Sequence, residues 1–397
     1  MEGTTIMYLN ELLDDLQPRI AALRRDLHAH PELAFNEKRT SDIVAATLAA
    51  AGVEVHRGIA GTGVVGVLKC GDGTGAIGLR ADMDALPLDE LNGFPHRSRH
   101  AGCMHACGHD GHTAMLLGAA EALAKTRNFN GTVHFIFQPA EEHEGGGRVM
   151  VEEGLFERFP MQMVFGLHNW PGLPAGNIAV MDGPVMAGAD RFEITITGHG
   201  GHAAMPHQAV DTVVAGAALV QALQTLVSRN TDPQDAAVVS VTRFHAGHAD
   251  NVLPEQAVLG GTVRCFRPEL QDALEEGMRR ICIGIEGTYR VKIGLQFERG
   301  YPPTINAEEP AFICREVARQ VVAQGGGGEV LAHLKPSMGA EDFAYLSRVV
   351  PGCYVWLGNG PGEGGCMLHS PRYDFNDDVI ATGIRYWVRL AERALPK

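Results

Sequence analysis

HTAMLLGAAEALAKTRNFNGTVHFIFQPAEE, residues 112–142 of this 397-residue chain, predicts a helix that leads directly into a buried strand. The run that begins at residue 132 is short, apolar and rich in aromatic and β-branched residues, which is typical of a strand. Two similar apolar runs flank the segment, AIGLRADMD at 76–84 and MVFGLHN at 163–169. Strands that alternate with helices are typical of α/β proteins. We therefore expect an α/β fold with a mostly parallel central sheet.

Polar side chains follow each of these predicted strands. Asp82 and Asp84 end the first strand, Glu141 and Glu142 end the second, and His168 ends the third. In open α/β sheets, functional sites gather at the carboxyl ends of the strands. The two adjacent glutamates would emerge on opposite sides of their strand, so that one can bind a metal while the other acts as a base. Taken alone, the same glutamates also fit a solvated acidic loop.

A different order of elements fills residues 189–299. Strand, helix, strand, strand, helix and strand follow one another, which is the ferredoxin-like βαββαβ order. The α/β pattern then resumes with a predicted helix at 309–323 and the apolar run CYVWLG at 353–358. The second domain is therefore expected to be inserted into the first, with boundaries near 186 and 300. The predicted division is a discontinuous domain of residues 1–186 and 300–397, and an inserted domain of residues 187–299.

The composition indicates a globular, acidic protein. Hydrophobic residues make up 45% and charged residues 20%, which excludes disordered, collagen-like and coiled-coil chains. Lys and Arg total 33 against 47 Asp and Glu, a net charge of −14, so nucleic acid and anionic membranes are not expected partners. The chain has no signal-peptide pattern and no run of about 18 apolar residues. Its eight scattered cysteines suit reduced thiols, and we expect a cytoplasmic protein.

The segment CMHACGHDGH, residues 103–112, carries the strongest local metal signal. It places two cysteines, three histidines and one aspartate within ten residues, just before a predicted helix. Thiolate and imidazole ligands suit zinc and similar borderline metals. A structural zinc bound wholly within this segment is the local alternative, but alternate residues of one short loop can seldom surround a metal tetrahedrally. The segment alone does not distinguish which of these residues bind.

Further candidate residues lie in the inserted domain and near the carboxyl terminus. Small residues around His202 permit close approach of a partner group, and Asn251 and Arg264 lie beside or on the following strands. An arginine that faces a cleft can hold a substrate carboxylate through two hydrogen bonds, although a surface salt bridge is its ordinary role. His369 follows a glycine-rich loop, where a histidine is usually a plain loop residue.

Nine motifs follow one another in order along the chain: RRDLHAHPELAFNE (24–37), GLRADMDALP (78–87), MHACGHDGHTAMLLGAA (104–120), FQPAEE (137–142), GLHNWP (166–171), GHGGHAAMPH (198–207), NVLPE (251–255), GAEDFAY (339–345) and LHSPRYDFND (368–377). Taken together, they resemble the M20 family of metallo-amidohydrolases, in its branch of N-acyl-amino-acid amidohydrolases and hippurate hydrolases. The resemblance covers nearly the whole chain. It implies a zinc-peptidase-like catalytic domain with a mostly parallel central sheet, and a ferredoxin-like domain that serves as lid and dimerisation domain.

The same resemblance implies a site with two divalent metal ions per subunit, either zinc, manganese, cobalt or nickel. Its implied ligands are Cys107, His109, Glu142, His168 and His369. Glu141 would be the general acid/base, and Cys103 would not be a ligand. The bridging ligand in this branch looks like a cysteine, where peptidases of the wider family use aspartate.

The resemblance also assigns roles to the inserted domain. His202 would reach the active site of a neighbouring subunit, in a homodimer or a dimer of dimers that forms through the lid. Asn251 and Arg264 match lid positions linked to substrate binding.

The expected reaction is hydrolysis of the amide bond of N-acyl-amino acids, such as hippurate-like or N-acetyl substrates, to a carboxylic acid and a free amino acid. The acyl group is not identified, because acyl specificity depends on pocket shape. A metallo-dipeptidase on the same scaffold is the nearest alternative. Two others are an amidase with a cysteine nucleophile, whose activity would survive chelation, and a non-catalytic metal-binding interaction protein.

Overall fold

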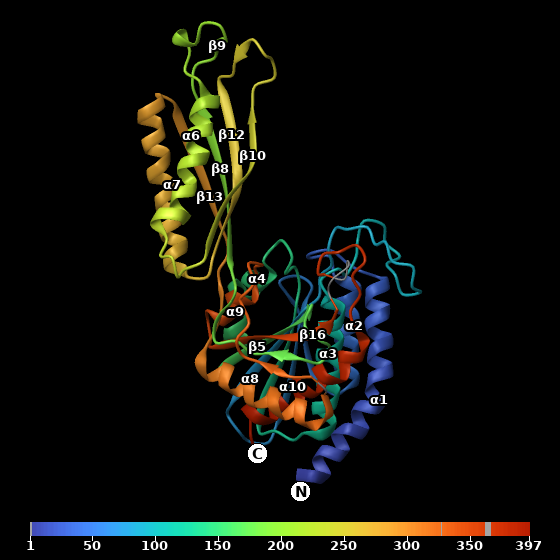
Figure 1. The fold of residues 1–397 in the computed structure, drawn as a ribbon. Helices are drawn as coiled ribbons and strands as arrows, with labels where there is room; N and C mark the ends of the chain where they lie inside the picture. Colours follow the sequence, from blue (N-terminus) through green and yellow to red (C-terminus); the bar gives the residue numbers. More distant parts are fainter. Residues whose placement is uncertain (1, 327, 362–366) are drawn as a thin grey trace. The chain divides into compact units, whose positions relative to one another are not determined.

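The computed structural model describes residues 2–326, 328–361 and 367–397, which form two compact units (Figure 1). Unit 1 comprises the chain as far as Gly183, together with Ile305–Lys335 and Asp342–Lys397. Unit 2 comprises Pro184–Thr304 and the short segment Pro336–Glu341. The chain therefore leaves unit 1, builds most of unit 2, and returns.

An eight-stranded sheet with the order β1-β2-β4-β3-β5-β16-β6-β15 forms the centre of unit 1. Its strands are β1 (Glu54–Ile59), β2 (Gly63–Cys70), β3 (Ala76–Asp82), β4 (Gly131–Gln138), β5 (Met163–Pro171), β6 (Ile178–Ala179), β15 (Val330–Leu331) and β16 (Gly352–Gly360). The four central strands β4, β3, β5 and β16 are parallel to one another. Antiparallel pairings occur toward the edges, between β1 and β2, β2 and β4, and β16 and β6. The predicted α/β fold with a mostly parallel central sheet is confirmed.

The strand register brings the carboxyl ends of β3, β4 and β5 to one edge of the sheet. Asp82 is the register partner of Gln138, and Arg80 pairs with both Ile136 and Gly166 on its two neighbouring strands. The polar residues that follow β3 and β4, and those near the end of β5, therefore meet at this edge.

Helices pack on this sheet in two groups. The larger group contains α1 (Glu2–Ala29), α2 (Lys38–Ala50), α3 (His109–Thr126), α8 (Glu308–Val321) and α10 (Ile380–Ala394). Helix α3 is almost wholly buried, as its mostly apolar sequence predicts, and it contacts α1, α10 and β3. The smaller group contains α4 (Gly146–Glu152), α5 (Leu155–Arg158) and α9 (Phe343–Ser347). Unit 1 thus buries its sheet beneath helices and leaves the polar strand ends to the loops.

Unit 2 is a four-stranded antiparallel sheet with two helices, in the order βαββαβ. The elements are β8 (Gly188–Thr197), α6 (Thr212–Thr225), β10 (Ala237–Ala246), β12 (Gln256–Cys265), α7 (Pro268–Tyr289) and β13 (Lys292–Tyr301). The sheet order is β10-β12-β8-β13, and buried residues alternate with more exposed ones along β8, as in a sheet with one covered face. Short pairings join β9 (Gly201–His202) to β11 (Val252–Leu253), and β7 (Gly183–Met186) to β14 (Thr304–Asn306).

Backbone hydrogen bonds attach the segment Pro336–Glu341 to unit 2. The Ser337 amide donates to the Val185 carbonyl at 2.9 Å, and the Ala187 amide donates to the carbonyls of Ser337 and Gly339 at 3.0 and 2.9 Å. Within the described parts of the chain, no helix is both long and apolar enough to cross a membrane.

A buried ion network ties α1 to the start of α3 and to the segment that follows His369. The Arg24 side chain is only 1% exposed, and it donates to Asp374 and to Asp377 at 2.7 Å each. Its guanidinium lies 3.5 Å from Asp110, which also contacts His28 at 2.9 Å. Burial lowers the pKa of His28, but the Asp110 charge and hydrogen bond outweigh it and raise that pKa to about 9. The network fixes the loops beside the polar edge of the sheet.

We predict that Arg24→Leu destabilises unit 1 by about 3–5 kcal/mol, because it removes a buried charge that three carboxylates share, those of the buried Asp110 and the partly buried Asp374 and Asp377. Arg25→Leu is the matched control. Arg25 donates to the same Asp377 at 2.6 Å, but its side chain is 54% exposed, so its loss should cost under about 1 kcal/mol. Urea unfolding followed by tryptophan fluorescence reports on unit 1, which contains all three tryptophans. Equal losses for the two variants would contradict this interpretation of the network.

Candidate metal centre

The polar edge of the sheet brings the five predicted metal ligands together in two groups that share one sulfur atom. Cys107, His109 and His168 form one group, and Cys107, Glu142 and His369 form the other, each with potential ligand atoms within 4.8 Å of one another. Cys107 Sγ lies 3.3 Å from His168 Nε2, and His369 Nε2 lies 3.4 Å from Glu142 Oε1. The two groups therefore meet at the Cys107 sulfur.

Local structure explains why these residues converge. Cys107 and His109 flank Gly108, whose left-handed backbone (φ 97°) begins α3 and which has no room for a side chain beside Asn169 and Tyr373. Glu142 follows β4, and His168 lies in β5, the neighbour of β3. His369 comes from the loop before α10, where its own amide donates to the Ala106 carbonyl at 2.7 Å.

The donor set fits a divalent metal ion. His109 Nε2 is buried and has no hydrogen-bond partner among the described residues, although oxygens of Asp82, Glu141 and Glu142 lie 3.8, 4.0 and 4.0 Å away. Burial lowers the pKa of His109, but the Asp82 charge and the contact with Asp84 raise it to about 10. The surroundings therefore favour a positive charge at this position. Sulfur, nitrogen and oxygen donors together suit zinc, manganese, cobalt or nickel.

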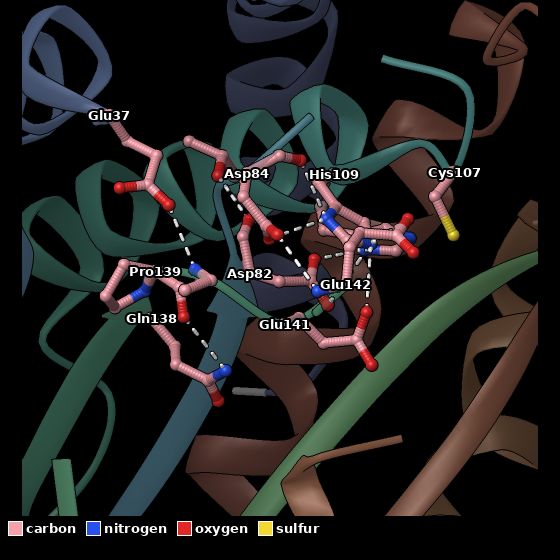
Figure 2. Close-up of polar contacts among 12 residues, drawn as sticks. Glu37, Asp82, Asp84, Cys107, His109, Gln138, Pro139, Glu141 and Glu142 are labelled. Atoms are coloured by element: carbon pink, nitrogen blue, oxygen red, sulfur yellow. Dashed lines mark hydrogen bonds and ion pairs between the residues drawn. The ribbon is translucent and has the colours of Figure 1, made fainter. Parts of the chain in front are cut away.

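Asp84 orients both halves of the site (Figure 2). Its carbonyl and Oδ1 lie 2.9 and 3.2 Å from His109 Nδ1, which leaves Nε2 directed at the site. Its Oδ2 accepts a hydrogen bond from the Glu142 amide at 2.9 Å. Metal-binding imidazoles usually direct the other ring nitrogen to a carboxylate or carbonyl, which fixes their orientation. His168 follows the same rule, because its Nδ1 lies 2.6 Å from the Asn169 carbonyl.

Asp82 and His112 form a third group with His109, but their side chains already have partners. Asp82 contacts His112 Nδ1 at 2.6 Å and accepts from Arg80 at 2.7 Å. The Asn169 amide donates to His112 Nε2 at 2.9 Å. These bonds indicate that Asp82 and His112 support the site. Burial and the nearby His112 hold the pKa of His168 well below its usual range, so His168 is neutral and able to bind a metal.

A buried arginine, which the sequence did not single out, joins side chains of β3, of β4 and of the segment before α9. Arg80 is 1% exposed and donates to Asp82, Gln138 and Asp342, at 2.7, 2.9 and 2.9 Å. Its signal in the sequence is a single arginine inside the apolar run AIGLRADMD. A charge at such a position in a buried strand requires buried partners.

Two further residues singled out from the sequence, Glu141 and Cys103, also lie in unit 1. Glu141 is 6% exposed and belongs to the group with His109 and Glu142. Cys103 belongs to none of the ligand groups found among the described residues, and burial raises the pKa of its thiol to about 11. Such a thiol is a poor nucleophile.

Unit 2 contains the other three predicted residues. His202 is exposed in β9, and the next residue, Ala203, donates its amide to the Asn251 carbonyl at 3.0 Å. Arg264 lies in β12, where burial and the charge of Arg191 lower its pKa. His202 and Asn251 are thus brought together within this unit.

Comparisons with known proteins found a matching family model, similar sequences and similar structures. Residues 78–393 match the model of the peptidase family M20/M25/M40. The chain is 41% identical to a hippurate hydrolase of Campylobacter jejuni, over 96% of this chain and 98% of that protein. It is 40% identical to an N-acetylcysteine deacetylase of Bacillus subtilis, over 94% and 96% of the two chains. A crystal structure of a dinuclear metal-binding peptidase of the M20 family from Bacillus subtilis superimposes with a TM-score of 0.83, at 36% identity over 95% and 98% of the chains.

We predict that Cys107→Ala weakens metal binding by more than about 100-fold, because even the loss of an outer-shell partner commonly costs 10- to 100-fold. Cys103→Ala is the matched control, since it removes a buried thiol from the same segment and should leave the metal content unchanged. Elemental analysis after dialysis against a weak chelator measures both variants. If Cys103→Ala loses the metal and Cys107→Ala keeps it, the ligand assignment is wrong.

Proposed function

The chain belongs to the peptidase family M20/M25/M40, and from this premise we propose that it hydrolyses N-acyl-amino acids. The enzyme is an amidohydrolase, and the products are a carboxylic acid and a free amino acid. One observation supports this most strongly: two donor groups share Cys107, and the buried carboxylate of Glu141 lies beside them. The hippurate hydrolase and the deacetylase, both about 40% identical, support an N-acyl-amino acid as the substrate.

We propose two divalent ions per subunit, one held by Cys107, His109 and His168 and the other by Cys107, Glu142 and His369. When bound, such ions polarise the scissile carbonyl and make an attacking water more acidic. The chain holds these ligands in place through Asp84, which contacts His109 and the Glu142 amide.

Glu141 is the proposed general acid/base. Its carboxylate accepts the proton of the attacking water and then delivers that proton to the departing nitrogen of the amino acid. The position suits this role because Glu141 directly precedes the proposed ligand Glu142, and its Oε2 lies 4.0 Å from His109 Nε2. A carboxylate next to the ligands can reach the water without occupying a ligand position.

The rival functions receive less support. A cysteine nucleophile would need an ionised thiol, yet burial raises the pKa of Cys103 to about 11, and Cys107 belongs to both ligand groups. A dipeptidase would use the same residues, so substrate tests distinguish it from an acyl-amino-acid hydrolase.

Residues of unit 2 are proposed to bind the substrate in a homodimer. His202 and Asn251 would donate hydrogen bonds to the oxyanion that develops on the scissile carbonyl, and Arg264 would pair with the substrate carboxylate. None of the described cysteines forms a disulfide, which supports the further proposal of a reducing, cytoplasmic location.

We expect wild-type protein reconstituted with zinc, manganese, cobalt or nickel to hydrolyse N-benzoylglycine or another member of a panel of N-acyl-amino acids. Glu141→Gln should lower kcat by at least about 100-fold, because it removes the general acid/base, while metal content stays normal. Glu144→Gln, an exposed glutamate in the same loop, is the control and should keep full turnover. Near-normal kcat in Glu141→Gln would refute its role, and failure of the wild type on the whole panel would refute the proposed function.

A complementation experiment tests whether His202 acts on a neighbouring subunit. Glu141→Ala and His202→Ala should each be nearly inactive as homodimers. In a mixed dimer, one site has an intact Glu141 and receives an intact His202 from its partner, so co-refolding should restore about half of the wild-type activity per heterodimer. If heterodimers confirmed by mass remain inactive, His202 does not act in trans.

A further inference from the structure

Glu37 is a fully buried carboxylate that contacts the backbone directly before Glu141 (Figure 2). It immediately precedes α2, and its Oε1 accepts hydrogen bonds from the Ala140 amide at 2.9 Å and the Phe35 amide at 3.1 Å. Its Oε2 accepts from the Thr62 hydroxyl at 2.6 Å. One carboxylate thus joins three chain segments that are distant in sequence.

The backbone that Glu37 holds has an unfavourable conformation. Ala140 has a φ of 56°, in the left-handed region that a residue with a Cβ seldom adopts. Such a conformation persists only where its surroundings impose it. The Gly146 amide donates to the Ala140 carbonyl at 2.9 Å, and a Cβ at Gly146 would lie 1.8 Å from the Pro139 carbonyl oxygen. The Ala140 turn is therefore held at its amide by Glu37 and at its carbonyl by Gly146.

Different contacts hold the strand end just before this turn. Gln138 donates to both oxygens of Asp342 at 2.7 and 2.9 Å, and it accepts from Arg80 at 2.9 Å. These bonds fix the last residue of β4 without Glu37. The next amide along the chain that donates to a side chain is that of Ala140, and its acceptor is Glu37.

We propose that Glu37 is a positioning residue for the hydrolytic reaction: by holding the Ala140 amide, it sets the direction in which Glu141 leaves the strand. In the described part of the chain, Glu37 forms no hydrogen bond or ion pair with the proposed ligands, so its influence on them passes through the backbone. The expected effect of Glu37 on turnover rests on the proposed function. Its expected effect on the Ala140 amide does not depend on any enzymatic activity.

The contacts of Glu37 require acceptor atoms and do not require a charge. Burial raises the pKa of Glu37 to about 7, although its hydrogen bonds oppose the rise. A glutamine at this position would keep one carbonyl oxygen for the Ala140 and Phe35 amides. Its amide group could donate to the Thr62 hydroxyl, which can act as donor or acceptor. Glu37→Gln should therefore preserve the turn, whereas Glu37→Ala should release it.

Three variants of the full-length protein test the proposal: Glu37→Ala, Glu37→Gln and Thr62→Val. Thr62→Val is the matched control, because it removes another buried hydrogen bond of the same carboxylate and leaves the Ala140 contact intact. Hydrogen exchange of the Ala140 amide, melting temperature, metal content, kcat and KM are measured for each. Glu37→Ala should exchange the Ala140 amide at least about tenfold faster. It should also lower kcat by about 10- to 100-fold at saturating metal, and leave KM within about threefold.

Glu37→Gln and Thr62→Val should match the wild type in amide exchange and kcat, even if their melting temperatures fall. If Glu37→Ala and Thr62→Val lose stability equally and both keep full kcat, Glu37 is only structural and the proposal is wrong. If Glu37→Gln is as impaired as Glu37→Ala, positioning by neutral hydrogen bonds is also wrong. If the wild type hydrolyses no N-acyl-amino acid, the proposed function fails, and unchanged Ala140 exchange in Glu37→Ala would then separately overturn the positioning role.

Discussion

The concentration of buried carboxylates at the carboxyl edge of the parallel sheet, which calls for positive charge among them, is the constraint on which the site depends. Asp82, Asp84 and Glu141 are each at most 6% exposed, and they surround the buried imidazole of His109, whose Nε2 has no hydrogen-bond partner among the described residues. Burying several negative charges together costs much free energy unless cations compensate them. Arg80 supplies one positive charge, through its 2.7 Å contact with Asp82. The surroundings also favour a positive charge on His109. Divalent ions bound at the proposed ligand groups would add further positive charge, beside the carboxylate of the proposed general acid/base Glu141.

The surrounding structure holds these charges through layers of hydrogen bonds. Asp84 orients His109 and Glu142 together. Farther out, Arg24 joins α1 to Asp374 and Asp377, beside the loop that carries His369. Networks of this kind are strong when every member has a partner and costly when one is lost. We therefore expect that the loss of one of these outer contacts disturbs the geometry of the proposed site.

Much of the fold and part of the site could be predicted from sequence, for reasons that are local. Apolar runs that end in Asp82, Glu141 and His168 predicted the sheet and the edge where these residues meet, because strand periodicity and strand ends are visible in a single sequence. The choice of Cys107 over Cys103 came only from the family resemblance, since spacing alone left six possible ligands in one segment. Contacts between residues far apart in the chain could not be predicted, because no pattern of neighbouring residues indicates them. The hydrogen bond from Ser337 to Val185, which attaches residues 336–341 to unit 2, and the bond from the Ala140 amide to Glu37 connect residues far apart in the chain.

The proposal that Cys107 is shared by two metal ions is tested most directly by anomalous diffraction from crystals of the metal-loaded protein, measured at the absorption edge of the bound metal. We expect two anomalous peaks per chain, both within bonding distance of Cys107 Sγ, about 2.3 Å for zinc, with His109 and His168 on one ion and Glu142 and His369 on the other. A single peak, or two peaks of which one lies away from Cys107, would contradict a centre in which one cysteine bridges two ions.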